Sequence, residues 1–430
     1  MRKFFQELFT HTIKAWNNIW FRETDTLVLD FLRIGIGLVL LCNYGFLILD
    51  FDFLYTDSGW VSVNILETYH DSIYIHSVLS FIKDPQLLFV SYIIFLFACA
   101  AFTLGLLTRW VKWFVLFFHL YYFHRNPAIV YGVDFIILGI LIPLVLAPIG
   151  QVLSLDRYRK LNQLKRKDLS AVLPVKKIPW GYACKRLIQL QMVICLFFAA
   201  IYKLDGSDWI NGDALWYALN GNEFKRLPLE WLASSYWIIN ILTYGTIFLQ
   251  LGYTFLIWGR RTRPFFLAEI VLVHIGIAVM LDLILFSAVM ILGHLSFFRR
   301  EWLATMGQKW KSWMDEMEVI YDGQCAFCVR SMASLLAFDG LKQITIRDYR
   351  TNPSPVVESE KVDKALYVVT GKGQAIPGFD AYRYMVVRIP GLIWLAPLFY
   401  IPVLSRLVGR PVYNWIASHR HVISTCVVNK

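Results

Sequence analysis

Eight apolar segments precede Arg299, and they constrain the fold of this chain more than any other feature of its sequence. A helix needs roughly 20 largely apolar residues to cross a bilayer, and several of these segments approach that length. Hydrophobic residues make up 57% of the 430 residues, more than the core of a soluble domain requires. The sequence therefore predicts an integral membrane protein with about eight transmembrane helices. The segments are Leu27–Leu49, Gln86–Leu107, Trp110–Tyr122, Tyr131–Ile149, Leu187–Ile201, Tyr236–Trp258, Pro264–Met280 and Leu283–Phe298.

The charges between these segments predict the direction in which the chain is threaded. Lys and Arg gather in alternate loops, ten of them between Arg157 and Arg186. The intervening loops are acidic, beginning with Asp50 after the first segment and Asp205 after the fifth. Because basic loops are retained on the cytoplasmic side, eight crossings would leave both termini in the cytoplasm. We expect the protein in a bacterial inner (plasma) membrane.

The amino-terminal segment and the net charge add to the predicted organisation of the chain. Residues 1–25 form a basic, aromatic, amphipathic stretch without a signal-peptide cleavage pattern, which favours a helix lying along the membrane interface. The formal charge of +11 resides mainly in short loops beside apolar runs, so we expect anionic lipids rather than nucleic acid as partners. The predicted parts are an interfacial segment (1–25), a transmembrane domain (26–300), a linker (301–317), an α/β domain (318–421) and a tail (422–430).

A Cys-x-x-Cys pair, Cys325 and Cys328, lies at the start of the α/β domain. A strand, a tight Asp-Gly turn and a helix place Cys325 in the first helical turn, where free amide groups and the helix dipole stabilise negative charge on sulfur. Cys328 follows one turn later, close enough to resolve a mixed disulfide on Cys325. The expected strands are Glu318–Tyr321, Gln343–Arg347 and Ala365–Val369, and the expected helix is Val329–Phe338.

The residues alone leave several roles open for this pair. It could be a redox-active dithiol, a structural pair of thiols, or part of a metal site with His419, His421 or Cys426. We expect no metal, because there is no second Cys-x-x-Cys. Asp322 could accept a proton from a thiol, or it could cap the helix or shape the turn.

Three groups of residues in this domain carry a resemblance to a known family. They are Tyr321-Asp322-Gly323 with Cys325 and Cys328, Gly378-Phe379-Asp380-Ala381, and Pro411-Val412-Tyr413 with Trp415-Ile416-Ala417 and Arg420. On these residues the domain resembles the DCC family of thiol-disulfide oxidoreductases. The resemblance implies a thioredoxin-like fold with Cys325 as the attacking thiol. In a reducing cytoplasm the pair would rest as a dithiol and act on a thiol protein or as a sensor.

Lys203 ends the fifth apolar segment and begins a loop that contains Trp209. A lysine at such a position commonly extends to the membrane interface, where it could pair with Asp205 or Asp208. Alternatively, an apolar pocket could hold its amine neutral, so that it serves as a general base.

Further residues around Lys203 also carry a resemblance. They are Tyr202-Lys203-Leu204-Asp205 with Asp208 and Trp209, His124-Arg125-Asn126-Pro127 with Gly132 and Asp134, Pro148 with Ser154-Leu155-Asp156, and His274 with Phe286 and Trp302. They resemble vitamin K-dependent γ-glutamyl carboxylases and the related bacterial HTTM superfamily. The resemblance implies that Lys203 deprotonates a reduced naphthoquinone, whose reaction with oxygen gives an epoxide and a strongly basic alkoxide.

The same resemblance makes His274, Arg125, Asn126, Asp134 and Trp209 candidates for holding this lipid quinone. From the residues alone, Arg125 and Asp134 could instead pair with each other, and buried histidines are most often structural. Our leading hypothesis is a membrane-bound redox enzyme that joins a quinone- or peptide-binding membrane domain to a thiol domain. The alternative is a maturation or binding factor for a secreted peptide. A transporter is disfavoured because no internal repeat is visible.

Overall fold

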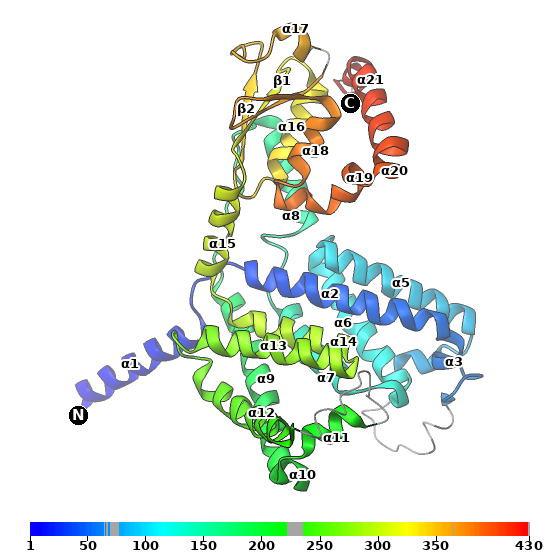
Figure 1. The fold of residues 1–430 in the computed structure, drawn as a ribbon, viewed down its shortest axis with the longest axis vertical. Coiled ribbons are helices and arrows are strands. Elements are labelled where there is room, and N and C mark those ends of the chain that lie inside the picture. Colours follow the sequence, from blue (N-terminus) through cyan, green and yellow to red (C-terminus); the bar gives the residue numbers. More distant parts are fainter. Residues whose placement is uncertain (64, 66–67, 69–76, 222–234, 364, 429–430) are drawn as a thin grey trace. The chain divides into compact units, whose positions relative to one another are not determined.

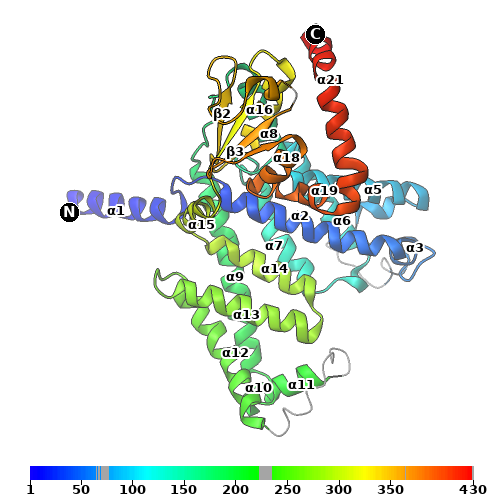
Figure 2. The ribbon, with the colours of Figure 1, turned by 45° about the horizontal axis from the view of Figure 1, so that its top comes forward.

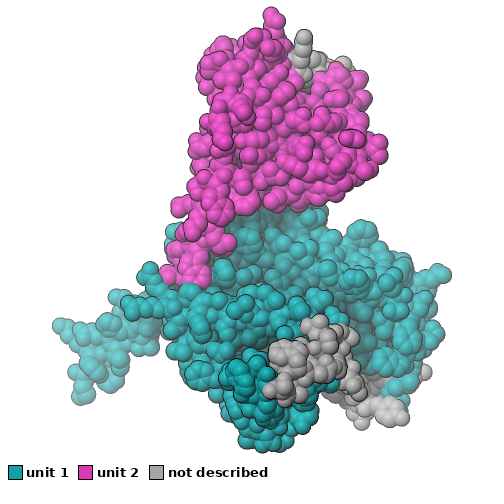
Figure 3. Space-filling model, viewed as in Figure 1, with its two compact units in different colours: residues 1–156, 175–298 teal, residues 157–174, 299–430 magenta. Residues whose placement is uncertain are grey.

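The computed structural model describes residues 1–63, 65, 68, 77–221, 235–363 and 365–428, with only the backbone for residue 2 and residues 420–428. The chain forms two compact units, coloured separately in Figure 3. Residues 1–156 and 175–298 make the first, which we call the membrane unit, and residues 157–174 and 299–430 make the second, the thiol unit.

In the residues described, the membrane unit consists of helices and connecting loops, without a strand. In both Figures 1 and 2, α2 runs beside α5, and α9 packs against α12. The helices are α1 (Arg2–Trp20), α2 (Leu27–Leu47), α3 (Phe51–Tyr55), α5 (Pro85–Leu104), α6 (Thr108–Arg125), α7 (Gly132–Leu146), α9 (Pro179–Leu204), α10 (Ser207–Asn211), α11 (Ala214–Asn220), α12 (Tyr236–Leu256), α13 (Arg263–Leu281) and α14 (Ile284–His294). Short 3-10 turns include η1 (Ile48–Asp50), η3 (Val78–Phe81), η4 (Pro127–Ile129) and η6 (Leu295–Phe297).

Each of the eight predicted apolar segments is helical in the structure. Among the described residues, five helices are long and apolar enough to span a membrane, namely α2, α5, α9, α12 and α13, or six if a bent helix pair near the carboxyl end is counted. The apolar helices α7 and α14 are shorter. The structure therefore supports a membrane protein, and the number of eight crossings remains a prediction.

Local sequence explains where these helices begin and end. Asp84 caps α5 by accepting a hydrogen bond from the amide of Gln86, and Pro85 occupies the first helical position, where a missing N–H costs nothing. The helix ends at Gly105, whose left-handed φ of 70° suits glycine. In contrast, α9 begins at Pro179, well before the predicted Leu187, because its first turns carry polar side chains that hydropathy alone excludes.

The thiol unit is built on a four-stranded mixed sheet in the order β2-β1-β3-β4. Strand β1 (Met317–Tyr321) pairs in parallel with β2 (Ile344–Asp348) and antiparallel with β3 (Tyr367–Thr370), and β4 (Ala375–Pro377) is antiparallel to β3. The helices are α15 (Arg300–Trp313), α16 (Ala326–Phe338), α17 (Ser359–Val362), α18 (Gly378–Val386), α19 (Ala396–Tyr400), α20 (Pro402–Leu404) and α21 (Arg410–Val428), with the turns η7 (Pro390–Leu395) and η8 (Ser405–Gly409). The α/β class and the three predicted strands are confirmed to within two residues at each end.

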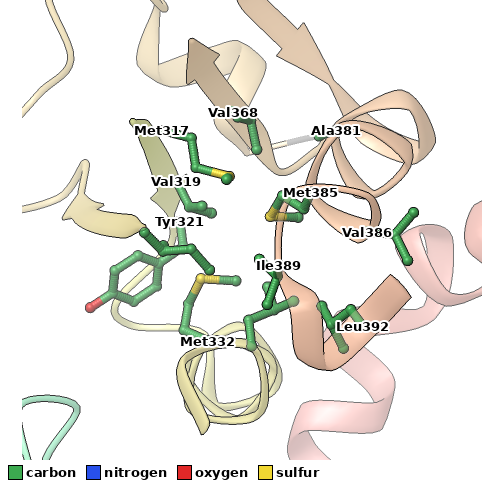
Figure 4. Close-up of a cluster of buried hydrophobic side chains, with 12 residues drawn as sticks. Met317, Val319, Tyr321, Met332, Val368, Ala381, Met385, Val386, Ile389 and Leu392 are labelled. Atoms are coloured by element: carbon green, nitrogen blue, oxygen red, sulfur yellow. The ribbon is translucent and has the colours of Figure 1, made fainter. Parts of the chain in front are cut away.

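The core of this unit lies between the sheet and the helices α16 and α18 (Figure 4). Val319 and Val368 project from neighbouring strands towards Met332 of α16 and Met385 of α18, and all four are fully buried. Figure 4 also shows Tyr321, the last residue of β1, beside Met332. This core fixes the end of β1 and the start of α16, between which the cysteine pair lies.

The thiol unit also contains a segment from between two predicted spans. In the part of helix α8 (Leu155–Lys167) that belongs to this unit, the Tyr158 ring stacks on Phe338 with centroids 4.0 Å apart. Leu169 packs against the core of the unit. Part of the basic segment 157–186, which the sequence presented as a loop, is therefore a structural element of the thiol unit. The predicted linker 301–317 is likewise mostly helix α15, whose Trp310 Nε1 donates to the carbonyl of Arg388 at 3.1 Å.

Candidate functional site

The cysteine pair occupies the turn between β1 and α16. Cys325 is the N-cap of α16, and its Sγ accepts a hydrogen bond from the amide of Cys328 at 3.4 Å. Cys325 is 5% exposed, whereas Cys328 is half-buried, and neither cysteine forms a disulfide in the structure. The predicted placement of Cys325 at the amino end of a helix is thus observed, because an extended cap residue directs its sulfur at the amides of the first turn.

Asp322 is buried beside the pair and bound to an arginine that sequence reasoning missed. Its two carboxylate oxygens accept from Arg350 Nε and Nη2, each at 3.2 Å, and Oδ1 also accepts from the amide of Gln324 at 3.0 Å. Hydrogen bonding to Asp322 raises the pKa of the Arg350 guanidinium, so this guanidinium stays charged. Of the roles left open by the sequence, this geometry shows Asp322 shaping the turn.

The turn is held from a second direction by Asp348, the last residue of β2. Asp348 Oδ1 accepts hydrogen bonds from the amides of Gly323 and Arg350, both at 3.0 Å. A Cβ added at Gly323 would lie 2.5 Å from Asp348 Cγ, so no other residue fits there without moving this carboxylate. Parallel pairing of Tyr321 with Asp348 is what brings the two segments together.

An apolar pocket of about 290 Å³ opens beside Cys328. Its walls come from α16, α18, α19, η8 and α21, and they include Phe327, Phe379, Tyr382, Leu398, Phe399 and Tyr413. Burial, followed by proximity to Tyr413 and Cys328, raises the pKa of Tyr382, so its phenol remains protonated at neutral pH. A pocket with these walls accepts an apolar group or an aromatic ring next to the thiol.

Residues of the family motifs contact one another next to this pocket. Gly378 has a left-handed φ of 61°, and a Cβ there would lie 3.2 Å from the Tyr413 ring, which explains why glycine stands at this position. Asp380 accepts from Arg410 Nη2 at 2.9 Å. These contacts hold the start of α18 against α21, which is distant from it in the sequence.

No metal centre is found in the part of the chain that the structure describes, where no group of three or more His, Cys, Asp or Glu side chains could hold an ion. His419 stacks on Trp415 with ring centroids 5.1 Å apart. The side chains of Arg420, His421 and Cys426 lie outside the described residues.

Lys203 and Trp209, both singled out from the sequence, are brought together in the membrane unit. Lys203 Nζ donates to Gln250 Oε1 of α12 at 3.0 Å and lies 4.9 Å from the centroid of the Trp209 ring. A third contact joins it to the carbonyl of Ala199 at 3.4 Å. Among the described residues Lys203 has no carboxylate partner, so the expected pairing with Asp205 or Asp208 is not observed.

Arg125, Asn126 and Asp134 have contacts that hold the chain together. Arg125 is 2% exposed, and its Nη2 pairs with Asp57 Oδ1 at 3.1 Å rather than with Asp134. Asn126 Nδ2 donates to the carbonyl of Leu54 at 2.7 Å. Asp134 caps its own helix by accepting from the amide of Tyr131 at 3.1 Å. These contacts close the ends of α3, α6 and α7, and whether the three residues also hold a ligand remains a prediction.

The two histidines of α13 and α14 are buried. His274 is 4% exposed and lies 5.6 Å from the Phe286 ring, the residue that accompanies it in the family pattern. His294 bonds through Nδ1 to the carbonyl of Met290, and its ring lies 5.1 Å from that of Tyr253. Within the described residues no hydrogen bond or ring contact joins His274 to Lys203.

Sequence reasoning also missed a buried ionic cluster in the membrane unit. Asp30 and Arg33 of α2 are both fully buried, and Asp30 accepts from the amides of Gly150, Val152 and Leu153. Arg33 donates to carbonyls of α5, including that of Thr103 at 2.7 Å. Asp30 and Arg33 are three residues apart and so lie on one face of the helix, a spacing from which this ion pair could have been predicted. The cluster fixes the segment after α7 and so has a structural role.

Helices of spanning length and a dithiol at a helix amino end define a membrane protein with a thiol-redox domain. A family model described as the HTTM domain matches residues 21–302, and the chain therefore belongs to that family. A second model, described as DCC1-like thiol-disulfide oxidoreductase, matches residues 319–426. The resemblances to the HTTM superfamily and to the DCC family are thus confirmed, and the resemblance to the carboxylases stays a prediction. Comparisons with curated proteins and with solved structures return no match.

Proposed function

We propose that this protein is a membrane-anchored thiol-disulfide oxidoreductase in which Cys325 and Cys328 exchange with a disulfide bound in the adjacent apolar pocket. The observation that carries the proposal is the contact of Cys325 Sγ with the amide of Cys328 at the start of α16, together with the pocket beside Cys328. A parallel β1-α16-β2 unit followed by an antiparallel β3-β4 pair and α18 supports the thioredoxin-like fold that the family implies.

The exchange balances as a two-electron transfer. The thiolate of Cys325 attacks one sulfur of the substrate disulfide, whose bond breaks, and the departing thiolate takes up a proton. Cys328 then attacks Cys325 in the mixed disulfide and releases the second substrate thiol. The substrate disulfide is reduced to two thiols, and the protein is left with a Cys325–Cys328 disulfide.

Two single variants of the full-length protein in detergent test this order of steps. With a fluorescent disulfide peptide as probe, Cys328→Ser should retain the probe on Cys325 as a mixed disulfide that resists washing and is released by dithiothreitol. Cys325→Ser should neither turn over nor retain it. If both variants reduce the probe at the wild-type rate, the pair has no catalytic role.

The thiol unit is built from two separate segments of the chain, and this constrains the membrane topology. We propose eight crossings with cytoplasmic termini. Residues 157–174 and 299–430 belong to one unit, so they lie on the same side of the bilayer. An even number of crossings must therefore separate them. Since α9, α12 and α13 have spanning length, α14 would supply the fourth. The basic residues of segment 157–174 favour the cytoplasm for this side. Modification of an introduced cysteine at Ser170 by a membrane-impermeant reagent added outside intact cells would contradict this orientation.

A second activity is suggested for the membrane unit by the contacts of Lys203. Its half-buried amine contacts an amide oxygen and an indole ring, and no carboxylate of the described residues pairs with it, so no fixed negative charge holds it in the ammonium form. We propose that Lys203 accepts a proton from a reduced naphthoquinone, a group that would supply reducing equivalents to oxygen. Gln250 and Trp209 would orient the amine, and His274 beside Phe286 is the candidate for contacting the ring.

Oxygen-dependent oxidation of reduced naphthoquinones by the purified protein tests this second proposal. Wild type and the Cys325→Ser/Cys328→Ser double variant should form epoxide, and Lys203→Ala should not. If folded wild-type protein forms none, the membrane unit acts as an anchor or as the binder of a secreted peptide, and the thiol unit is the sole catalyst.

A further inference from the structure

The carboxyl-terminal helices of the thiol unit carry an exposed apolar surface. Residues 390–409 contain a single charged side chain, Arg406, in a stretch of twenty. Together with the start of α21, this stretch is long and apolar enough to span a membrane. Its two helical parts, Pro390–Tyr400 and Pro402–His419, are however bent by 82° relative to each other. The segment carries exposed apolar side chains, six of which we together call the apolar face: Ile393, Trp394, Val403, Leu407, Val412 and Trp415. Each is between 46% and 73% exposed.

The opposite side of the same segment is packed into the thiol unit. Leu392 is 6% exposed and belongs to the core of the unit, and the Phe399 ring stacks on Phe379 with centroids 5.1 Å apart. A Cβ on Gly409 would meet the Phe379 ring at 2.9 Å. The segment therefore cannot cross a bilayer without leaving this core, and the apolar face alone is free to enter lipid.

The residues around the apolar face are those of a membrane interface. Two tryptophans and Tyr400 are exposed, and such rings concentrate at the level of the headgroups. Two arginines lie on the same segment: Arg406, whose charge complements anionic phosphates, and Arg410, which pairs with Asp380. The same chain contains helices of spanning length, so this domain is tethered to a bilayer.

We propose that the apolar face docks into the headgroup–acyl boundary of an anionic bilayer, roughly 5–10 Å deep, as interfacial helices do. Val408 and Val412 belong to this segment and also line the pocket beside Cys328. Docking would therefore open the pocket towards lipid, so that an apolar disulfide reaches the Cys325–Cys328 pair without passing through water. This last step rests on the proposed function, whereas docking itself does not.

Depth-dependent quenching tests the docking on the full-length protein in nanodiscs of phosphatidylglycerol and phosphatidylcholine. An environment-sensitive fluorophore is attached to Leu407→Cys in a background where Cys42, Cys325, Cys328 and Cys426 are serine. The matched control is Val356→Cys, an apolar position of the same unit that is 48% exposed and precedes α17. Figure 1 shows α17 well separated from α19 and α20.

Nitroxide groups on the lipid chains should quench the label at position 407 several-fold more than the label at position 356. Equal quenching at the two positions, strong or weak, would overturn the docking. Leu407→Glu provides a second measurement, because Leu407 does not line the pocket. It should leave reduction of a water-soluble disulfide unchanged and slow reduction of a lipid-linked one. If Leu407→Glu slows the reduction of both disulfides, the result counts against access from lipid. If the wild-type protein reduces neither disulfide, the redox function is refuted, while the quenching result still tests the docking.

Discussion

Replacing Gly323 by alanine should loosen the turn that carries the cysteine pair. The new methyl group would lie 2.5 Å from Asp348 Cγ and 2.8 Å from Oδ1, whereas carbon atoms pack at roughly 3.5–4.0 Å. The carboxylate must therefore shift by about 1 Å, which breaks its hydrogen bonds from the amides of Gly323 and Arg350. Bonds to a charged acceptor contribute about 1.5–3 kcal/mol each. Lower entropy of the unfolded alanine chain offsets about 0.4–1 kcal/mol, which leaves a net loss of about 2–5 kcal/mol.

Amide hydrogen exchange on the full-length protein measures this loss locally. For peptides that cover β1 and the first turns of α16, exchange should be at least about 30-fold faster in Gly323→Ala, since each 1.4 kcal/mol corresponds to a factor of ten. Gly340→Ala is the matched control, because its methyl group would meet nothing within 4 Å. If Gly323→Ala exchanges like wild type and like the control, Asp348 does not hold this turn as argued.

Three further variants test other contacts. Arg350→Ala should lower the melting temperature of the thiol unit, because it leaves Asp322 with fewer charged partners. Arg350→Lys should restore the melting temperature only partly, since an ammonium cannot reproduce both guanidinium bonds. If Arg350→Ala melts at the same temperature as wild type, the ion pair is dispensable. Tyr158→Ala removes the contact with the Phe338 ring, which is worth about 0.5–1.5 kcal/mol. It should speed tryptic cleavage within residues 157–167. An unchanged rate of cleavage would mean that this segment is not part of the folded unit. Gln250→Ala should lower, without abolishing, any quinol oxidation that depends on Lys203, and an unaltered rate would mean that the amide does not orient the amine.

The tertiary contacts explain why the candidate sites were only partly visible in the sequence. Cys325 and Cys328 were found because their spacing and the preceding Asp-Gly turn are local features. Arg350 lies 28 residues beyond Asp322, and Gln250 lies 47 residues beyond Lys203, so no periodicity or motif connects them. Arg125 pairs with Asp57 rather than with Asp134, which is closer in sequence and was one of the partners that the sequence left open.

The sequence by itself determined the apolar helices, the boundary between membrane and thiol segments, and the position of the dithiol at a helix start. Hydropathy, helix length and turn chemistry are properties of neighbouring residues and can be read along the chain. Only the tertiary structure decided that residues 157–174 join the thiol unit and that α18, η8 and α21 enclose a pocket beside Cys328. Those outcomes depend on which distant surfaces bury one another, because apolar side chains are similar enough to pack in many combinations until the whole core selects one.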